Sequence, residues 1–205
     1  LLFVAFALSG MATLSMAMAP RKLGAQRPYA NGVLMLILGF FVTVMLLLAN
    51  PFETLATPPA DGQGINPLLT HPGMFFHPPA LMAGLVATAI PLAFSMGSLI
   101  GGKTGDEWVD AGRQWGLISW ALLAGGLVLG SWWAYTILGW GGFWFWDPVE
   151  NASLMPWLTG TAFLHSGMIQ EKRGMLKVWN VSLIIMTYSL TLFGTFLTRS
   201  GIVSS

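Results

Sequence analysis

Residues 1–19 read LLFVAFALSGMATLSMAMA, a stretch without one charged side chain that is long enough to cross about 30 Å of hydrocarbon. The stretch stops at Pro20, Arg21 and Lys22, where a proline and two cations are typical of a membrane exit. Over all 205 residues only 8% are charged and the mean hydropathy is +0.68. Soluble domains carry about 25% charged residues, so the sequence predicts a membrane protein.

Comparable apolar runs occur five more times along the chain. They cover residues 33–49, 80–101, 116–138, 152–169 and 178–197. Each run is apolar on every face, unlike a soluble amphipathic helix. We therefore expect an all-α, polytopic transmembrane helical bundle of about six spans, with residues 1–205 as a single membrane domain. Because the chain opens inside an apolar run without an initiator methionine, we expect it to be a fragment of a longer protein.

The cations are distributed unevenly between the predicted loops. Eight of the nine lie on alternate connections: Arg21, Lys22, Arg27, Lys103, Arg113, Lys172, Arg173 and Lys177. Lysine and arginine collect on the cytoplasmic side of membranes, so these loops are expected inside. The other loops are then expected outside: residues 50–79, 139–151 and 198–205. Arg199 is the only lysine or arginine that they contain. A net charge of +1 gives a nucleic-acid partner no electrostatic basis, and the chain has no cysteine for disulfide or thiolate chemistry.

Tryptophan is concentrated around the outer loop at residues 139–151. The loop contains Trp140, Trp144 and Trp146, interleaved with phenylalanine and glycine. One interpretation is an aromatic belt at the membrane interface. The other is a platform of rings presented side by side to a large planar apolar ligand such as haem, which would gain stacking and hydrophobic burial. The residues alone leave both interpretations open.

The loop is followed by a helix-start pattern. Asp147 is a favoured N-cap, Pro148 suits the first helical position, and Glu150 lies where a capping box places its acidic residue. Span five is therefore predicted to begin near Pro148. The competing interpretation gives the two carboxylates acid–base or cation-binding roles, but they would repel the anionic propionates of a haem.

The chain contains three histidines, of which His77 and His165 are candidate ligands. His77 precedes two prolines at the end of an outer loop, on the same side as the tryptophans, and is either solvated or a ligand to a metal. His71 is expected to be a solvated loop residue. His165 lies within span five, about 25 Å of helix from Pro148. It is expected either to form a hydrogen bond between helices or to be an axial ligand of a buried haem b.

Two features concern the packing of the spans. Gly97 with Gly101, and Gly126 with Gly130, form small-xxx-small pairs that are expected to let helix backbones approach closely. Pro91 is expected to bend span three, as is Pro156 in span five, because proline removes a backbone hydrogen bond.

The loop at residues 140–151, WGGFWFWDPVEN, resembles the tryptophan-rich "WWD" signature of membrane haem-handling proteins in cytochrome c biogenesis. More narrowly, the chain resembles CcmF-type haem lyase subunits of bacterial cytochrome c maturation. The segments that carry the resemblance stand in the family's order: His77-Pro78-Pro79, the WWD loop, Phe163-Leu164-His165-Ser166 and Thr198-Arg199-Ser200-Gly201. They cover essentially the whole chain.

The resemblance implies attachment of haem to apocytochrome c at the periplasmic face of the bacterial inner membrane. It implies three partners: a periplasmic haem chaperone, the apocytochrome, and a subunit that presents the acceptor thiols. Haem is then the transferred substrate, with His77 as an axial ligand to its iron and the tryptophan loop as its platform. His165 corresponds to one ligand of an intramembrane haem b. We expect Arg199 either to bind a propionate or to anchor the end of its span.

The family's second ligand of each haem lies beyond the residues present here, so each haem site is expected to be incomplete. Three other functions stay in view. A haem exporter shares the WWD platform but is a compact protein. A haem b-containing respiratory membrane subunit needs paired histidines in its spans, and only His165 is present. A permease would use its aromatic residues only as interface anchors.

Overall fold

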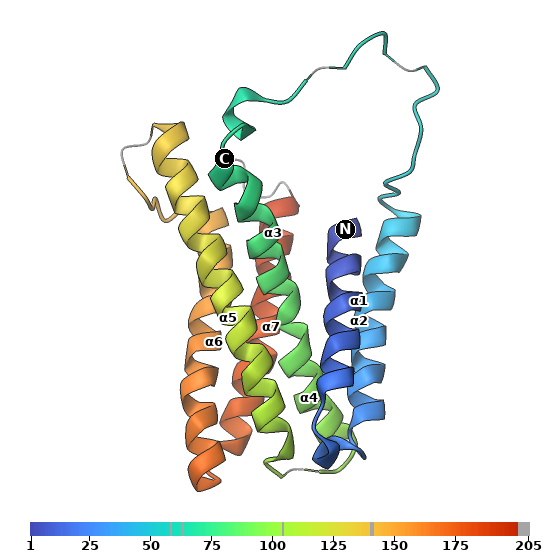
Figure 1. The fold of residues 1–205 in the computed structure, drawn as a ribbon, viewed down its shortest axis with the longest axis vertical. Coiled ribbons are helices and arrows are strands. Elements are labelled where there is room, and N and C mark those ends of the chain that lie inside the picture. The colour runs from blue at the N-terminus through green and yellow to red at the C-terminus, as the bar shows by residue number, and fades with distance from the viewer. Residues whose placement is uncertain (58, 63, 104, 140–141, 201–205) are drawn as a thin grey trace.

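The computed structural model describes residues 1–57, 59–62, 64–103, 105–139 and 142–200, and these form helices and connecting loops without a strand. The helices are α1 (Leu2–Met18), α2 (Arg27–Leu47), α3 (Pro72–Ala87), α4 (Ala89–Ile100), α5 (Glu107–Trp133), α6 (Pro148–Arg173) and α7 (Lys177–Arg199) (Figure 1). Short helical turns are η1 (Arg21–Leu23), η2 (Pro67–Leu69) and the π-helical η3 (Ala134–Leu138), which extends α5. The predicted all-α, polytopic membrane architecture is confirmed.

Four helical segments are long and apolar enough to cross a membrane: Arg27–Leu47, Pro72–Ile100, Glu107–Leu138 and Lys177–Arg199. They contain the runs predicted for spans four and six, and all but the last one or two residues of the runs predicted for spans two and three. The remaining two predicted spans fall short of that standard for different reasons. α1 is apolar but has only 17 residues, whereas α6 has 26 residues and contains serine, threonine, glycine and histidine along its middle.

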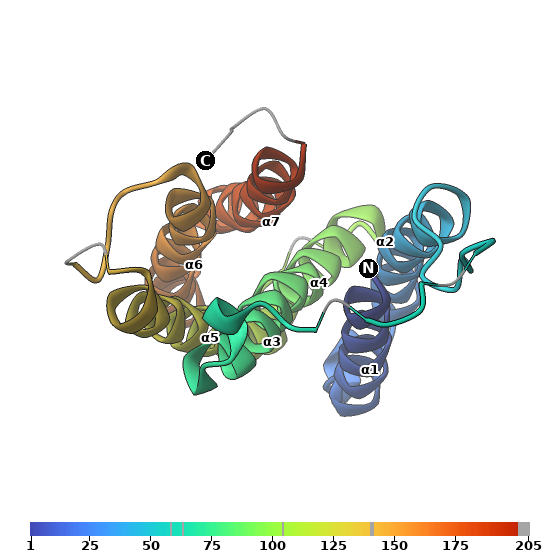
Figure 2. The same cartoon turned by 90° about the horizontal axis from the view of Figure 1, so that it is seen from above.

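The helices are packed side by side with α5 between α3 and α6, as the view from above in Figure 2 shows. α1 and α2 form a pair on the far side of α3 and α4, and α7 packs against α6 and reaches α4. α3 ends at Ala87, four residues before Pro91, whose missing N–H leaves the Ala87 carbonyl without its usual helical donor. The helix is therefore interrupted at Thr88, close to the bend predicted at Pro91, whereas α6 continues as one helix through Pro156, where a bend was also predicted.

Glycines bring the helix backbones together at the predicted crossings. A Cβ at Gly126 of α5 would lie 2.7 Å from the Cα of Leu81 in α3, and a Cβ at Gly97 of α4 would lie 2.7 Å from the backbone nitrogen of Ala30 in α2. Ser119 of α5 also donates a 2.8 Å hydrogen bond to the Gly84 carbonyl of α3. Close backbone approach and hydrogen bonds between helices are the usual means of association in lipid. The predicted close approach is confirmed for Gly126 and Gly97, whereas Gly130 and Gly101 face the side chains of His77 and Tyr29.

This packing yields a stability prediction. Gly126→Ala places a methyl group against the backbone of α3, and we expect it to destabilise the protein by about 1–3 kcal/mol, as overpacking of a filled core does. The midpoint of thermal unfolding in detergent is expected to fall by roughly 3–10 °C. The neighbouring Gly125→Ala is the matched control, because nothing lies within 4 Å of its Cβ position. Equal midpoints for the two variants would contradict the close α3–α5 contact.

The basic loops gather at one end of the bundle. Lys22 of η1 forms an ion pair with Asp110 of α5 at 3.7 Å, and Lys177 of α7 pairs with Asp106 at 3.3 Å. A buried polar network joins the same end: Gln170 donates to Asp106 at 2.8 Å and accepts from Asn180 at 2.7 Å. These contacts place three connections that are far apart in sequence at one surface, the lower end in Figure 1. We call it the cationic end.

Candidate functional site

His77 lies inside α3, not in the loop that precedes it. The predicted outer loop at 50–79 is therefore wrong at its C-terminal boundary, because α3 begins at Pro72. His71 caps the helix by accepting a 3.1 Å hydrogen bond from the Gly73 N–H, and Pro72 occupies the first helical position, where proline is favoured. The helix thus extends about two turns further than the apolar run predicted.

The imidazole of His77 is half-buried against α5. Its Nδ1 lies 2.7 Å from the carbonyl oxygen of Gly126, and a Cβ at Gly130 would lie 2.6 Å from its Cε1. The His77 ring therefore occupies the space that a side chain at position 130 would need. A carbonyl oxygen only accepts hydrogen bonds, so we assign the proton of the neutral ring to Nδ1. Nε2 then carries a free lone pair, the state in which histidine binds a metal.

His71 has the opposite hydrogen-bonding pattern. Its Nδ1 accepts from Gly73, so the neutral ring carries its proton on Nε2. Its ring also packs edge-on against Trp132, with centroids 4.7 Å apart. The expected solvated loop residue is thus a helix cap that is held by an aromatic contact, and in this tautomer neither ring nitrogen is free to bind iron.

His165 lies on an exposed face of α6. Its Nδ1 is 2.8 Å from the carbonyl oxygen of Thr161, one turn earlier in the same helix, so the proton again belongs on Nδ1 and the lone pair on Nε2. The expected hydrogen bond between helices is wrong, because the acceptor belongs to α6 itself. The ring borders a hollow between α5 and α6. Its lining residues are Arg113, Leu117, Trp120, Thr161, Leu164 and Met168.

The tryptophans of the segment divide into two groups. Trp133 donates to the Leu68 carbonyl at 3.0 Å, and Trp157 stacks on Trp120 at 5.5 Å, so these rings serve packing. In the loop, Trp146 is 68% exposed and meets Trp144 edge-to-face at 6.0 Å and 80°. The side-by-side presentation expected of the loop is therefore wrong for this pair, because the two planes are nearly perpendicular.

Trp140 lies outside the described residues. Trp144 is half-buried, and its indole Nε1–H has no hydrogen-bond partner among the residues that the structure describes. Nearby, Tyr135 and Phe143 stack at 4.1 Å with nearly parallel planes. The end of α5 and the loop therefore offer both flat rings and one unused donor.

Polar groups at the start of α6 hold the loop in place. Asp147 accepts from the Glu150 N–H at 2.7 Å, which confirms the predicted cap and the helix start at Pro148. The side chain of Glu150 accepts from the Phe145 N–H at 2.8 Å. Asn151 donates to the Trp146 carbonyl at 2.9 Å and so supports a left-handed φ of +59° at Trp146. Such a conformation in a non-glycine residue costs about 1–2 kcal/mol and requires support.

Asn151→Ala is therefore expected to loosen the tryptophan loop without unfolding the bundle. Loss of one hydrogen bond worth about 1 kcal/mol should raise the population of the open loop roughly fivefold. Chymotrypsin cleavage at the loop aromatics, measured in detergent, should accelerate by the same factor. The control is Val149→Ala, an exposed side chain in the same helical turn. Unchanged cleavage in the asparagine variant would show that Asn151 does not hold Trp146.

Arg199 is the last residue of α7 and is exposed. It forms no ion pair with any residue that the structure describes. Its side chain borders an apolar groove of about 550 Å³ that is also lined by residues of α1, α2 and α3. Arg199 is thus an unpaired cation at the end of the bundle opposite the cationic end.

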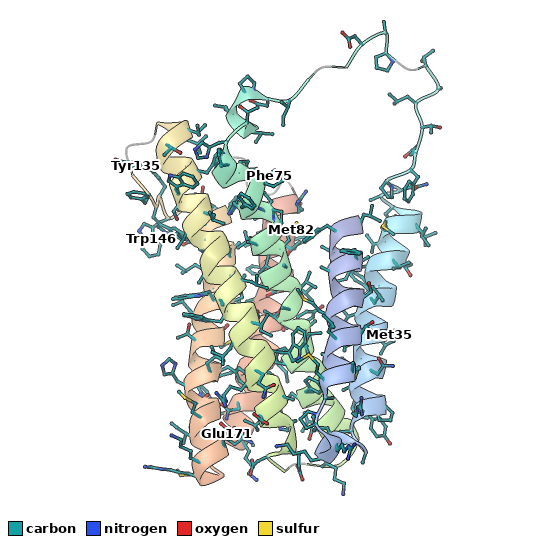
Figure 3. The ribbon with its side chains drawn as sticks, viewed as in Figure 1. Met35, Phe75, Met82, Tyr135, Trp146 and Glu171 are labelled. Carbon is teal, nitrogen blue, oxygen red and sulfur yellow. The ribbon has the colours of Figure 1, made fainter. Side chains whose placement is uncertain are left out.

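His77, Trp144, Trp146 and Arg199 share that opposite end. Trp144 and Trp146 contact each other, but no hydrogen bond or ring contact among the described residues joins this pair to His77 or Arg199. Figure 3 shows Trp146 at the edge of the α5–α6 side, whereas Phe75, two residues before His77, lies on α3. The described parts of the chain contain no cluster of three or more metal-ligating side chains. A metal bound here would therefore need most of its ligands from outside the chain, as the porphyrin ring supplies them to its iron.

The fold and these residues define a class: a polytopic helical membrane protein with a tryptophan-rich loop and two histidines whose Nδ1 atoms contact backbone carbonyls. The sequence profile of the family described as "Cytochrome C assembly protein" matches residues 1–203. The chain belongs to this family, as a CcmF-type protein.

Relatives of known name support the assignment. The cytochrome c-type biogenesis protein CcmF of Pseudomonas aeruginosa is 51% identical over 166 residues, which are 80% of this chain and 25% of the relative. CycK of Bradyrhizobium diazoefficiens is 50% identical over 80% of the chain, and CcmF of Haemophilus influenzae is 50% identical over 85%. The chain spans about a quarter of the length of these relatives. No solved structure matches it significantly.

Proposed function

We propose that this chain forms the haem-handling region of a cytochrome c haem lyase that attaches haem to apocytochrome c. One observation carries the proposal. Nδ1 of His77 and of His165 each lies within hydrogen-bond distance of a backbone carbonyl, which assigns the ring proton to Nδ1 and the lone pair to Nε2, whereas Nδ1 of His71 accepts from an N–H. A histidine that binds a metal almost always donates its other ring nitrogen to such a second-shell acceptor. Because the relatives are named as cytochrome c-type biogenesis proteins, iron porphyrin is the appropriate metal group.

The incoming haem is the substrate of the outer site. Nε2 of His77 binds the iron of this haem at one axial position. The faces of the porphyrin pack against the tryptophan loop, which contains Trp140, Trp144 and Trp146. The perpendicular pair suits a planar porphyrin, because one indole can stack on its face while the other indole contacts its edge. Arg199, an exposed cation, is a donor of suitable chemistry for a propionate.

The bond-forming step adds a cysteine S–H across a haem vinyl C=C, so that sulfur bonds to one carbon and hydrogen to the other. This chain has no cysteine, and the thiols come from the apocytochrome, presented by a further subunit. A periplasmic haem chaperone delivers the haem. What the chain contributes is position: it fixes the porphyrin by iron ligation and ring packing while the thiol approaches.

We propose that His165 would hold a resident haem b in the membrane through its Nε2. The residues present fit such a group: a neutral imidazole with a free Nε2 on an exposed helix face, beside apolar Leu117, Leu164 and Met168. When bound, the haem b supplies an electron that keeps the incoming iron reduced. The role of His165 is to ligate and orient it through the Thr161 carbonyl.

The proposed orientation follows the positive-inside rule. The cationic end faces the cytoplasm, and the tryptophan loop with His77 faces the periplasm of the bacterial inner membrane. The gathering of three basic connections at one surface supports this assignment.

An optical spectrum of the whole protein, purified in detergent, tests the proposal. The expected result is a Soret band with b-type features on reduction, and additional haem uptake when a haem-loaded periplasmic chaperone is added. A protein without haem absorption, and unable to take haem from the chaperone, would overturn it.

A further inference from the structure

A further pocket, which no histidine lines, lies at the cationic end between α4 and α7. Its volume is about 180 Å³. α4 contributes Ser95, Ser98 and Leu99; α7 contributes Lys177, Val178, Val181 and Ser182; Lys103, Trp108 and Gln170 complete the lining. Because Ser95, Ser98 and Leu99 are three and four residues apart, they share one face of α4. The pocket opens between two helix ends.

One buried polar atom in this pocket has no partner. Ser95 is fully buried, and its Oγ makes no hydrogen bond to any residue that the structure describes. The other hydroxyls are engaged, since Ser98 donates to the Lys103 carbonyl and Ser182 to the Val178 carbonyl. A buried hydroxyl without a partner is costly, which points to a ligand atom that accepts from Ser95.

Two cations stand at the mouth of the pocket. Lys103 is exposed and forms no ion pair with a described residue, whereas Lys177 shares its charge with Asp106 at 3.3 Å. Asp106 is further satisfied by Gln170 and does not line the pocket. The mouth therefore has a net positive charge. Below it, exposed Leu99 and Val178 present apolar surface to the membrane.

We propose that this pocket binds an anionic phospholipid, with the phosphate between Lys103 and Lys177. Ser95 lies about 6 Å of helix deeper than Leu99, at the level of the glycerol ester, whose carbonyl oxygen accepts from its Oγ. The glycerol backbone then lies between Leu99 and Val178, and the acyl chains continue past Ser95 and Val181 into the membrane. Basic pockets between transmembrane helices are the usual binding sites of anionic headgroups. The proposal rests only on residues of the cationic end, so it is independent of haem handling.

Native mass spectrometry of the detergent-purified protein tests the proposal, with phosphatidylglycerol and phosphatidylcholine of identical chains as probes. Phosphatidylglycerol is expected to bind several-fold more tightly. Lys103→Gln is expected to weaken its binding about fivefold, the effect of one lysine near an anionic lipid. Lys172→Gln, an equal charge change at an exposed lysine of the same end and outside the pocket, should leave it unchanged.

Equal affinity for the two lipids, or equal losses in the two lysine variants, would overturn the site in favour of general charge attraction. Ser95→Ala supplies a second readout: it should weaken phosphatidylglycerol and phosphatidylcholine alike, because both have the ester carbonyl. No haem enters these measurements, so failure here leaves the haem proposal untouched, and failure of haem binding leaves this one untouched.

Discussion

His77→Ala is expected to abolish stable capture of haem from the chaperone while the content of haem b stays at its normal level. The substitution removes the only described side chain at that end of the bundle that has a free metal-competent nitrogen. Loss of a second-shell partner alone weakens metal binding 10–100-fold, so loss of the ligand itself should weaken capture by more than about 100-fold. Haem transfer from the loaded chaperone, followed by absorbance, measures the effect.

Two further variants make this result specific. His71→Ala removes a helix cap worth about 1 kcal/mol and should leave haem capture intact. In His77→Gly, added imidazole should restore part of the capture, because the free base can occupy the vacated seat beside Gly130. Undiminished capture by the alanine variant, or an equal loss in the His71 variant, would refute His77 as the ligand.

His165→Ala is expected to have the converse effect. The b-type spectrum should be lost by at least tenfold, because no other described imidazole lies on the exposed α5–α6 face. His165→Met should retain some haem with a more positive reduction potential, since a thioether ligand raises the potential of haem iron. Redox titration of the purified variants provides both readouts.

His71→Ala again serves as the control, with a normal content of haem b. Full haem b content in His165→Ala would remove His165 from the ligand set. If His77→Ala and His165→Ala each caused the same loss of both haem capture and haem b, the two histidines would bind one shared haem rather than two.

The sequence was most informative about the helices and least informative about the start of α3. Uncharged apolar runs predict helices wherever a membrane-length stretch must satisfy its own backbone, and Asp147 with Pro148 locates the start of α6 because capping is a local interaction. In contrast, PGMFFHPP at residues 72–79 contains three prolines and has the composition of a loop. The cap at His71 and the Pro72 that follows it were the local signals for a helix.

The site depended on contacts that no local pattern encodes. The glycine pair on α5 predicted a close crossing, but not that Gly130 would receive the His77 ring, from a residue more than 50 positions away. The tautomers of the three histidines are set by backbone carbonyl or N–H groups and so follow from the fold alone. Likewise, composition reveals neither the bond from Asn151 to the Trp146 carbonyl nor the perpendicular arrangement of the Trp144 and Trp146 rings.

The most direct test is the structure of the haem-loaded whole protein in a lipid nanodisc, read at the bond between the iron and Nε2 of His77. We expect that bond to be present, with the porphyrin packed against Trp144 or Trp146 at the end opposite the basic loops. Haem bound with Nε2 of His77 uncoordinated, and with both indoles facing lipid, would contradict the account.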